Sequence, residues 1–350
     1  MPGPLNGIRI IEIAGLGPGP FAAMMLADHG AEVIRVERPG SPLDRSDPLL
    51  RSRKIVHHDL KSPEGRDAIR QLVRQADGLI EGFRPGVMER LGLGPDVLLA
   101  DNTNLIYGRM TGWGQDGHYA QRAGHDINYI AVSGALHMVG RKDEPPVPPI
   151  NLVGDFGGGG MMLAFGMVSA LLAVKSGAKG QVIDCAMTDG SALLTAMMWG
   201  FRAKGLWQDQ RQSNLLDGAA PFYDTYRTSD GHYMAVGAIE PQFYAALLKG
   251  TGLDHDPLFA TQMDPDLWPQ QKQRLAQVFM ARTRDEWTSL FDGVDACVTP
   301  VLGMTDAARA PHNTQRQTFI TIDGTEQPAP APRYSHTPCD PPVAPVWLED

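Results

Sequence analysis

The stretch that decides the fold runs from residue 8 to residue 40 and reads IRIIEIAGLGPGPFAAMMLADHGAEVIRVERPG. Residues 8–14 are a short apolar run of the kind that forms a buried strand, and the tight turn GLGPGP follows them. Residues 21–30 have the pattern of a helix that is closed by Gly30, and residues 31–40 have that of a second strand. These three elements make a βαβ unit, so the sequence predicts an α/β fold built on a parallel sheet.

The same alternation continues along the first part of the chain. A helical pattern follows Ser62, and apolar runs at 77–83 and 104–112 predict further strands. A long apolar helix that ends at Gly180 precedes a strand at 181–190 and a helix at 191–205. We expect these elements to form one large, Rossmann-like domain.

The pattern changes after residue 205. Residues 205–222 lack clear periodicity and are interpreted as a crossing linker, and strands with a turn at Ser229-Asp230-Gly231 follow within 223–239. Helical patterns then continue to a stretch near Met304, which predicts a smaller α+β domain. The tail from about residue 326 is rich in proline and is expected to pack in extended form.

Composition limits the classes of function. The length of 350 residues suggests about two domains, and the net charge of −9 argues against nonspecific binding of nucleic acid. Three widely separated cysteines, Cys185, Cys297 and Cys339, are typical of thiols in a reducing compartment. The first residues have no secretory pattern, the final WLED is not a peroxisomal signal, and the apolar run 161–174 is too short to span a bilayer. We therefore expect a cytoplasmic protein that binds neither nucleic acid nor membrane.

The glycine-rich turn after the first strand raises the alternative of a dinucleotide-binding site. Three glycines lie in that turn, and Glu37 ends the second strand roughly where a ribose-binding acid would lie. However, the dinucleotide fingerprint requires glycine where this chain has Pro20, and both Pro18 and Pro20 lack the N–H donors that would face a pyrophosphate. The turn is therefore interpreted as a structural one.

Residues 122–160 contain the strongest candidates for catalysis. His125, between Gly124 and Asp126, lies just before a helical pattern, and Asp155 lies just before a glycine run and the long apolar helix. A helix N-terminus suits developing negative charge because its first N–H groups lack partners. A histidine and a carboxylate at two such ends would provide two proton carriers. The alternatives are a structural histidine and an aspartate that only caps its helix.

Three further features accompany these candidates. Gly157 to Gly160 cost backbone entropy in a helix, so we expect a ligand or a second backbone to approach closely there. Asn151, four residues before Asp155, could hold the Asp155 side chain or a substrate oxygen. Glu240 precedes a proline at a strand-to-helix junction, and it is either a first-turn acid favoured by the helix dipole or a carboxylate that orients a histidine.

A group of basic residues in the first part of the chain has two interpretations. They are either scattered surface charges or a binding site for a polyanionic phosphate ligand, because several follow strand ends of the expected parallel sheet. The group consists of Arg38, Arg51, Arg53, Lys54, Lys61, Arg84 and Arg90.

Several segments of the chain resemble the α-methylacyl-CoA racemases, which belong to the family III CoA-transferase superfamily. Besides residues 7–41, these segments are DLKSPEG, LIEGFRPGVMERLGLG, MTGWGQDG, AGHDINYIAVSG, NLVGDFGGGG, DGAAPFYDTYRTSDGHYMAVGAIEPQFY and DACVTPVL. The resemblance covers most of the chain apart from the proline-rich tail. Histidine in the motif GHDINY distinguishes the racemases from the transferases, which use an aspartate nucleophile near the position of NLVGD.

The resemblance implies a role for each candidate residue. His125 and Asp155 would be the two acid/base residues on opposite faces of the substrate α-carbon, with Glu240 supporting His125 and Asn151 supporting Asp155. The remaining residues would bind the substrate: Arg38, His58, Asp59, Leu60, Lys61, Arg84 and Arg90 would hold CoA, and Gly124, Asp126, Ile127, Asn128 and Tyr129 would line the thioester pocket with His125. CoA would be part of the substrate, and no metal or further cofactor is expected.

The resemblance also implies a homodimer of two interlocked rings, with the active site between the large domain of one chain and the small domain of the other. We expect a large domain at residues 1–190, a linker at 191–225, a small α+β domain at 226–315 and a return linker at 316–325. Residues 326–350 would complete the large domain.

The expected reaction interconverts (2R)- and (2S)-2-methylacyl-CoA by moving the α-proton through an enolate. The acyl chain stays open among a branched fatty acid, a sterol side chain and an aryl-propionyl group. The two alternatives are a family III CoA transferase with Asp155 as the nucleophile, and an acyl-CoA-binding protein without catalytic activity.

Overall fold

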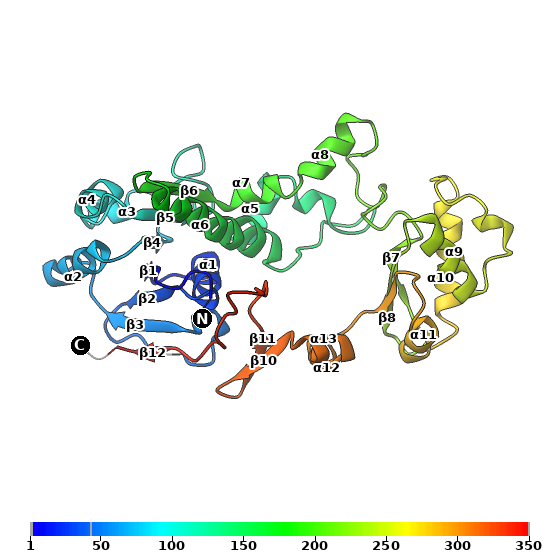
Figure 1. Cartoon of the computed structure of the whole chain (residues 1–350). Coiled ribbons are helices and arrows are strands. Elements are labelled where there is room, and N and C mark those ends of the chain that lie inside the picture. The colour runs from blue at the N-terminus through cyan, green and yellow to red at the C-terminus, as the bar shows by residue number, and fades with distance from the viewer. Residues whose placement is uncertain (1–2, 43, 349–350) are drawn as a thin grey trace. The chain divides into compact units, whose positions relative to one another are not determined.

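The computed structural model describes residues 3–42 and 44–348 of the chain. The described residues form two compact units (Figure 1). The larger unit contains the residues up to Ala135, Pro148–Ala196 and the residues from His312 onward, and the smaller unit contains Leu136–Val147 and Met197–Pro311. Each unit has its own buried core.

The larger unit is built on a seven-stranded sheet in which every neighbouring pair of strands is parallel. The strand order is β12-β3-β2-β1-β4-β5-β6, so the order reverses between β1 and β4. The strands are β1 (Arg9–Ile13), β2 (Glu32–Glu37), β3 (Arg53–His57), β4 (Gly78–Glu81), β5 (Ile106–Thr111), β6 (Gln181–Ala186) and β12 (Val346–Trp347). This topology confirms the α/β fold with a parallel sheet that the sequence predicts.

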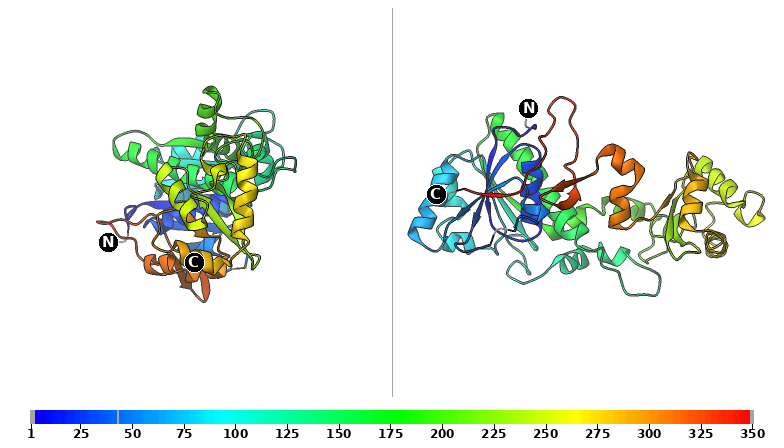
Figure 2. Two further views of the ribbon diagram at one scale, coloured as in Figure 1. Left: turned by 90° about the vertical axis from the view of Figure 1, so that its right-hand side faces the viewer. Right: turned by 90° about the horizontal axis from the view of Figure 1, so that it is seen from below.

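Helices cover both faces of this sheet, as Figures 1 and 2 show. Successive residues of β1 point to opposite faces: Ile10 lies in a core with α1 (Pro18–Asp28) and α6 (Met162–Lys175), whereas Ile11 lies in a core with α2 (Pro63–Arg74) and α4 (Pro95–Asp101). Ser62 caps α2 by accepting a hydrogen bond from Gly65, as its sequence pattern predicts. The remaining elements of this unit are α3 (Val87–Arg90), α5 (Asp126–Val132), α7 (Met187–Leu193), α13 (Pro311–Arg316), the 3₁₀ turn η1 (Pro48–Leu50), the π-helix η3 (Leu152–Met161) and the hairpin β10 (Phe319–Ile322) with β11 (Thr325–Pro328).

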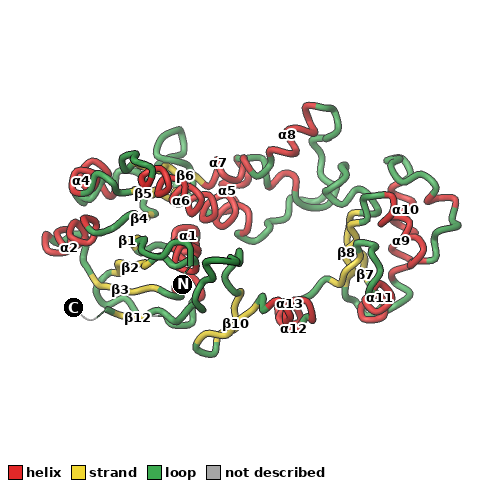
Figure 3. The backbone as a smooth tube through the Cα atoms, in the orientation of Figure 1, coloured by secondary structure: helices red, strands yellow, loops and turns green. Residues whose placement is uncertain are grey.

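The smaller unit combines an antiparallel sheet with helices. Its strands β7 (Tyr223–Arg227), β8 (Tyr233–Gly237) and β9 (Val298–Pro300) pair in that order. The core is aromatic, with Tyr226 stacked on Phe279 at 5.1 Å between ring centroids. Its helical elements are η2 (Leu136–Met138), α8 (Ala196–Ala203), α9 (Pro241–Thr251), η4 (Pro257–Phe259), α10 (Trp268–Phe279), α11 (Arg284–Phe291) and α12 (Met304–Arg309). Residues 204–222 contain neither helix nor strand and form the long green loop between α8 and β7 in Figure 3.

A buried ionic network lies beneath the turn GLGPGP. The carboxylate of Glu12 accepts hydrogen bonds from Arg35 at 2.5 Å and from Arg53 at 2.7 Å. Arg35 also donates to the carbonyl of Gly15, and Arg53 donates to that of Pro20. The network therefore ties β1, β2 and β3 to both ends of the turn.

The glycine run in η3 serves close contact between backbones. A Cβ atom on Gly158 would lie 2.5 Å from the backbone nitrogen of Ser191 in α7, and one on Gly160 would lie 2.7 Å from the Phe21 ring in α1. Real Cβ atoms do not approach other atoms so closely, so alanine at either position would force the helices apart. This finding agrees with the expectation that a second backbone approaches the run.

Together, η3 and α6 form one continuous helical segment, Leu152–Lys175, of 24 residues. The expectation that the apolar run is too short to span a bilayer was wrong, because η3 extends the helix toward its N-terminus. Within the described residues, this segment has the length and composition of a membrane span, and 44% of its most apolar 18-residue stretch is buried in the structure. A core helix can have the same length and composition.

Gly158→Ala is expected to lower the free energy of unfolding by about 1–3 kcal/mol, the usual cost of overpacking a tight contact. The control is Gly166→Ala in α6, where a Cβ atom would meet Ile183 at an ordinary distance of 3.4 Å. The control should unfold at the wild-type urea concentration or above it, since alanine favours a helix. A wild-type midpoint for Gly158→Ala would contradict the packing described for η3.

Candidate active site

A cavity of about 570 Å³ opens at the carboxyl ends of β1, β4 and β5. This is the edge beside the reversal of strand order, where open α/β sheets bind their ligands. The described residues that line it belong to the larger unit. They come mainly from the turn at residues 15–20, residues 80–85 after β4, residues 110–113 after β5, residues 120–125 before α5 together with Tyr129, and from Asn151, Asp155 and Met187.

His125 lies at the start of α5, as the sequence predicts, and its side chain is exposed to the cavity. Its backbone N–H donates to the side-chain oxygen of Asn128 at 3.0 Å, and its carbonyl accepts from the Asn128 N–H at 2.8 Å. This reciprocal pairing with Asn128 is a capping box that fixes the backbone of His125.

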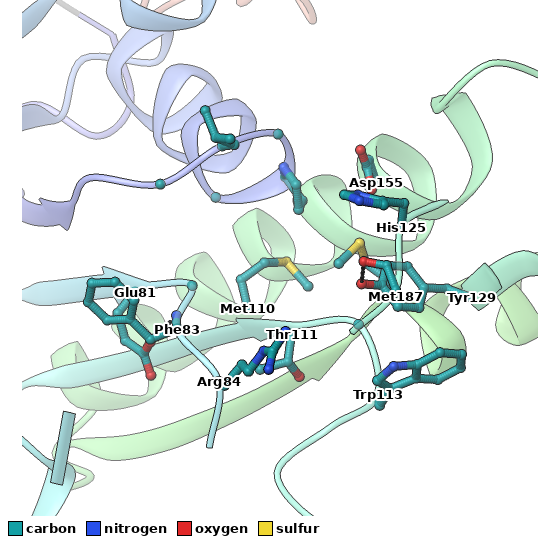
Figure 4. A pocket seen from close by; sticks show the side chains of 18 of the residues that line it. Glu81, Phe83, Arg84, Met110, Thr111, Trp113, His125, Tyr129, Asp155 and Met187 are labelled. Atoms are coloured by element: carbon teal, nitrogen blue, oxygen red, sulfur yellow. Dashed lines mark hydrogen bonds between the residues drawn. The ribbon is translucent and has the colours of Figure 1, made fainter. Parts of the chain in front are cut away.

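Asp155 lies in the first turn of η3, and the helix begins three residues before it, at Leu152. The side-chain amide of Asn151 donates to one carboxylate oxygen of Asp155 at 3.2 Å. The backbone N–H of Asp155 donates to the carboxylate of Asp126 at 2.6 Å. Figure 4 shows the carboxylate of Asp155 beside the imidazole of His125 at one end of the cavity.

Partial burial raises the pKa of the Asp155 carboxyl above its ordinary value. The hydrogen bond from Asn151 acts in the opposite direction, the charge of Asp126 raises this pKa, and His125 lowers it. A carboxyl group with a raised pKa exchanges protons more readily at neutral pH than an ordinary aspartate does.

The wall beside His125 is aromatic. The Tyr129 hydroxyl donates to the carbonyl of Gly124, and its ring meets Trp113 edge-on at 4.8 Å between centroids. A Cβ atom on Gly124 would lie 2.7 Å from the Tyr129 ring, so glycine is required for this packing. The aromatic contacts therefore hold the segment that carries His125.

Glu81 is a cavity residue that the sequence reasoning missed. It ends β4, its side chain is buried, and it accepts hydrogen bonds from the Phe83 N–H at 2.7 Å and from Arg109 at 3.1 Å. Burial raises the pKa of Glu81 to about 7, although these two donors favour its charged form. The sequence feature that could have identified Glu81 is a charged residue at the end of an otherwise apolar strand.

A second cavity, of about 390 Å³, gathers five of the residues that were expected to hold CoA. They are Arg38, His58, Asp59, Leu60 and Lys61. Ile13 and Phe83 line both cavities, so the two cavities share a wall.

The other predicted residues lie in different surroundings. Arg84 lines the first cavity, whereas Arg90, Ile127 and Asn128 are exposed and are not among the residues that line either cavity. The side chain of Asp126 is buried beneath Asp155. Glu240 belongs to the smaller unit, where it immediately precedes α9.

Two arginines of the basic group are engaged inside the protein. Arg51 pairs with Asp28 at 2.5 Å and Arg53 with Glu12 at 2.7 Å, and all four side chains are buried. They stabilise the fold rather than face a phosphate ligand. Among the described residues, no group of three or more His, Cys, Asp and Glu side chains is arranged to hold a metal ion.

Residues 5–346 match the sequence family described as CoA-transferase family III. The α-methylacyl-CoA racemase of Mus musculus is 51% identical over 339 residues, which cover 96% of this chain and 88% of the mouse protein. The α-methylacyl-CoA racemase of Homo sapiens is 50% identical with the same coverage. A CAIB/BAIF family protein from Brucella suis has the same fold, with a TM-score of 0.82 and 26% identity over 97% of this chain and 95% of that chain.

Asn151→Ala is expected to raise the pKa of Asp155 further, because the ionised carboxylate loses a hydrogen-bond donor. The pKa is measured by ¹³C NMR of protein with labelled aspartate carboxyl groups, in which the Asp155 signal is identified by its loss in Asp155→Asn. The control is Asn104→Ala at an exposed site outside the cavity. An unchanged or lowered pKa in Asn151→Ala would contradict the described role of Asn151.

Proposed function

The chain belongs to CoA-transferase family III, and we propose that it is an α-methylacyl-CoA racemase, an isomerase that interconverts (2R)- and (2S)-2-methylacyl-CoA. The observation that carries this proposal is the pair of His125 and Asp155, which lie beside each other in one cavity (Figure 4). The proposal is supported by two α-methylacyl-CoA racemases that are 51% and 50% identical to this chain.

One of the two residues removes the α-proton of the thioester, and the conjugate acid of the other returns a proton to the opposite face. Inversion needs two proton carriers, because a single base would tend to return the proton to the face from which it came. An imidazole and a carboxylate of raised pKa suit both halves of this exchange near neutral pH. The electron pair of the broken C–H bond moves to the thioester oxygen and gives an enolate.

The enolate oxygen requires hydrogen-bond donors. We place it near the backbone N–H groups of Asp126 and Ile127, the first two of α5, which directly follow His125 and have no carbonyl of their own helix within reach. In other enzymes, the loss of one such donor costs about 10²–10³ in rate. These N–H groups would lie beside His125, one of the two proton carriers.

The two cavities that share Ile13 and Phe83 suit the two ends of an acyl-CoA. The nucleotide end would lie against Arg38, His58 and Lys61, whose cationic and polar groups suit phosphates. The thioester would then pass Phe83 to reach His125 and Asp155. Arg84 and Arg90 would lie near the phosphates of CoA. CoA enters as part of the substrate, and its contacts position the reacting carbon.

We further propose a homodimer in the cytoplasm. Met161, Phe165, Val168 and Leu172 repeat at helical spacing on one face and are 40–71% exposed, which leaves an apolar stripe along the end of η3 and α6. A second copy of the chain would cover this stripe. In such a dimer Glu240 of one chain would orient His125 of the other, and the three free cysteines suit a reducing compartment.

His125→Ala and Asp155→Ala are each expected to abolish racemisation of 2-methylacyl-CoA, because each removes one of the two proton carriers. The assay uses (2S)- and (2R)-substrates in deuterated water and follows α-deuterium incorporation and loss of optical purity. The affinity for CoA should stay near the wild-type value in both variants.

An Asp155→Ala enzyme that still racemises would contradict this assignment. A wild-type enzyme that exchanges CoA between two acids without α-deuterium incorporation would be a transferase, and one that does neither would be an acyl-CoA-binding protein.

Arg84→Ala is expected to weaken CoA binding while the fold stays intact, because a cation at the cavity wall is lost. Isothermal titration with CoA measures the affinity, and Arg74→Ala, at an exposed site paired with Asp101, is the control. Equal affinities for both variants would remove Arg84 from the CoA site.

A further inference from the structure

Asp126 connects the two proposed proton carriers. It follows His125 directly in the sequence, and its carboxylate accepts the backbone N–H of Asp155 at 2.6 Å, across 29 residues of chain. Asp126 is only 6% exposed. A single buried residue therefore ties the start of α5 to the first turn of η3.

The surroundings of Asp126 are built for this contact. A Cβ atom on Gly154 would overlap the carboxylate oxygen of Asp126 that accepts the hydrogen bond. Glycine is therefore required at position 154 for the two segments to meet. The neighbouring Gly158 permits the close contact of the same helix with α7.

The second carboxylate oxygen of Asp126 is buried and has no hydrogen-bond partner among the described residues. A buried oxygen without a partner costs stability. An asparagine could accept the same N–H without a buried charge. The aspartate thus adds a carboxylate charge beside Asp155 that the hydrogen bond alone does not require.

We propose that Asp126 is a positioning residue for Asp155. The carboxylate of Asp126 fixes the Asp155 backbone beside His125, and the negative charge of Asp126 keeps the Asp155 carboxyl group ready to accept and return a proton. This inference rests on the proposed racemase function. It adds a role for the side chain of Asp126, which differs from the thioester contact that the sequence resemblance implies.

Few other charged groups lie close enough to Asp155 to oppose the effect of the Asp126 charge on its carboxyl group. Among the described residues, the titratable groups that face Asp155 come from α5 and the residue before it: His125, Asp126 and Tyr129. In α1 and α7, the atoms nearest to the glycines of η3 belong to uncharged residues, namely Pro18, Phe21, Met187, Gly190 and Ser191. Asp189 is the charged residue of α7. The charge of Asp126 contributes to the raised pKa of Asp155, after burial as the largest cause.

Asp126→Asn tests the charge, because asparagine keeps an oxygen that can accept the Asp155 N–H. In this variant the pKa of Asp155 should fall, which carboxyl ¹³C NMR measures without any substrate. In the direction of racemisation in which Asp155 removes the proton, Asp155 must be deprotonated. The fall of kcat/KM on the acid side of its pH profile should therefore move to lower pH in this variant. A purely structural role for Asp126 would leave both measurements at their wild-type values.

Asp126→Ala tests the hydrogen bond and should lower kcat by about 10- to 100-fold with little change in KM, because small displacements of a catalytic group have effects of this size. Gly154→Ala provides an independent variant, since its Cβ would displace the same carboxylate oxygen, and it should lower kcat in the same way. Both are compared with Gly166→Ala, which should keep the wild-type kcat.

The proposal is overturned if the pKa of Asp155 is unchanged in Asp126→Asn, or if folded Asp126→Ala and Gly154→Ala keep kcat within twofold of wild type. A wild-type protein that incorporates no α-deuterium would instead sink the proposed function. In that case the NMR titration of Asp126→Asn still decides whether Asp126 controls Asp155.

Discussion

The close approach of η3 to α1, α5 and α7 is the constraint on which the rest of the site depends. Asp155 can reach the cavity only because glycines replace side chains on the faces where η3 meets its neighbours. Glycine weakens a helix, so the run is costly for the local structure. The packing around the run offsets this cost, since the buried residues of α1, α6 and β5 form one continuous core beside it.

The second requirement is that charges near the cavity are held in place by partners. Glu12, Arg35 and Arg53 form a buried network that fixes the turn after β1, which is one wall of the cavity. Asn151 and Asp126 act on Asp155 in opposite electrostatic directions, and both contact it directly. The cavity thus combines rigid walls with a carboxyl group whose proton affinity depends on two neighbours.

The sequence predicts the parallel sheet well, because β1, β2, β4 and β5 are apolar runs between turns. It does not reveal β3, since Arg53 resembles a surface charge until its partner Glu12 is known. The start of η3 was also missed, because a run of glycines is a poor helix signal. His125 and Asp155 could be singled out by residue type and position, whereas Glu81 and the buried contact of Asp126 depend on long-range packing that a sequence pattern does not contain.

A crystal structure of the protein with a bound 2-methylacyl-CoA would test most directly whether His125 and Asp155 flank the reacting carbon. We predict that the α-carbon lies between the imidazole of His125 and the carboxylate of Asp155, each within roughly 3–3.5 Å and on opposite faces of the carbon. An α-carbon that lies outside this cavity, or one with both groups on the same face, would contradict it.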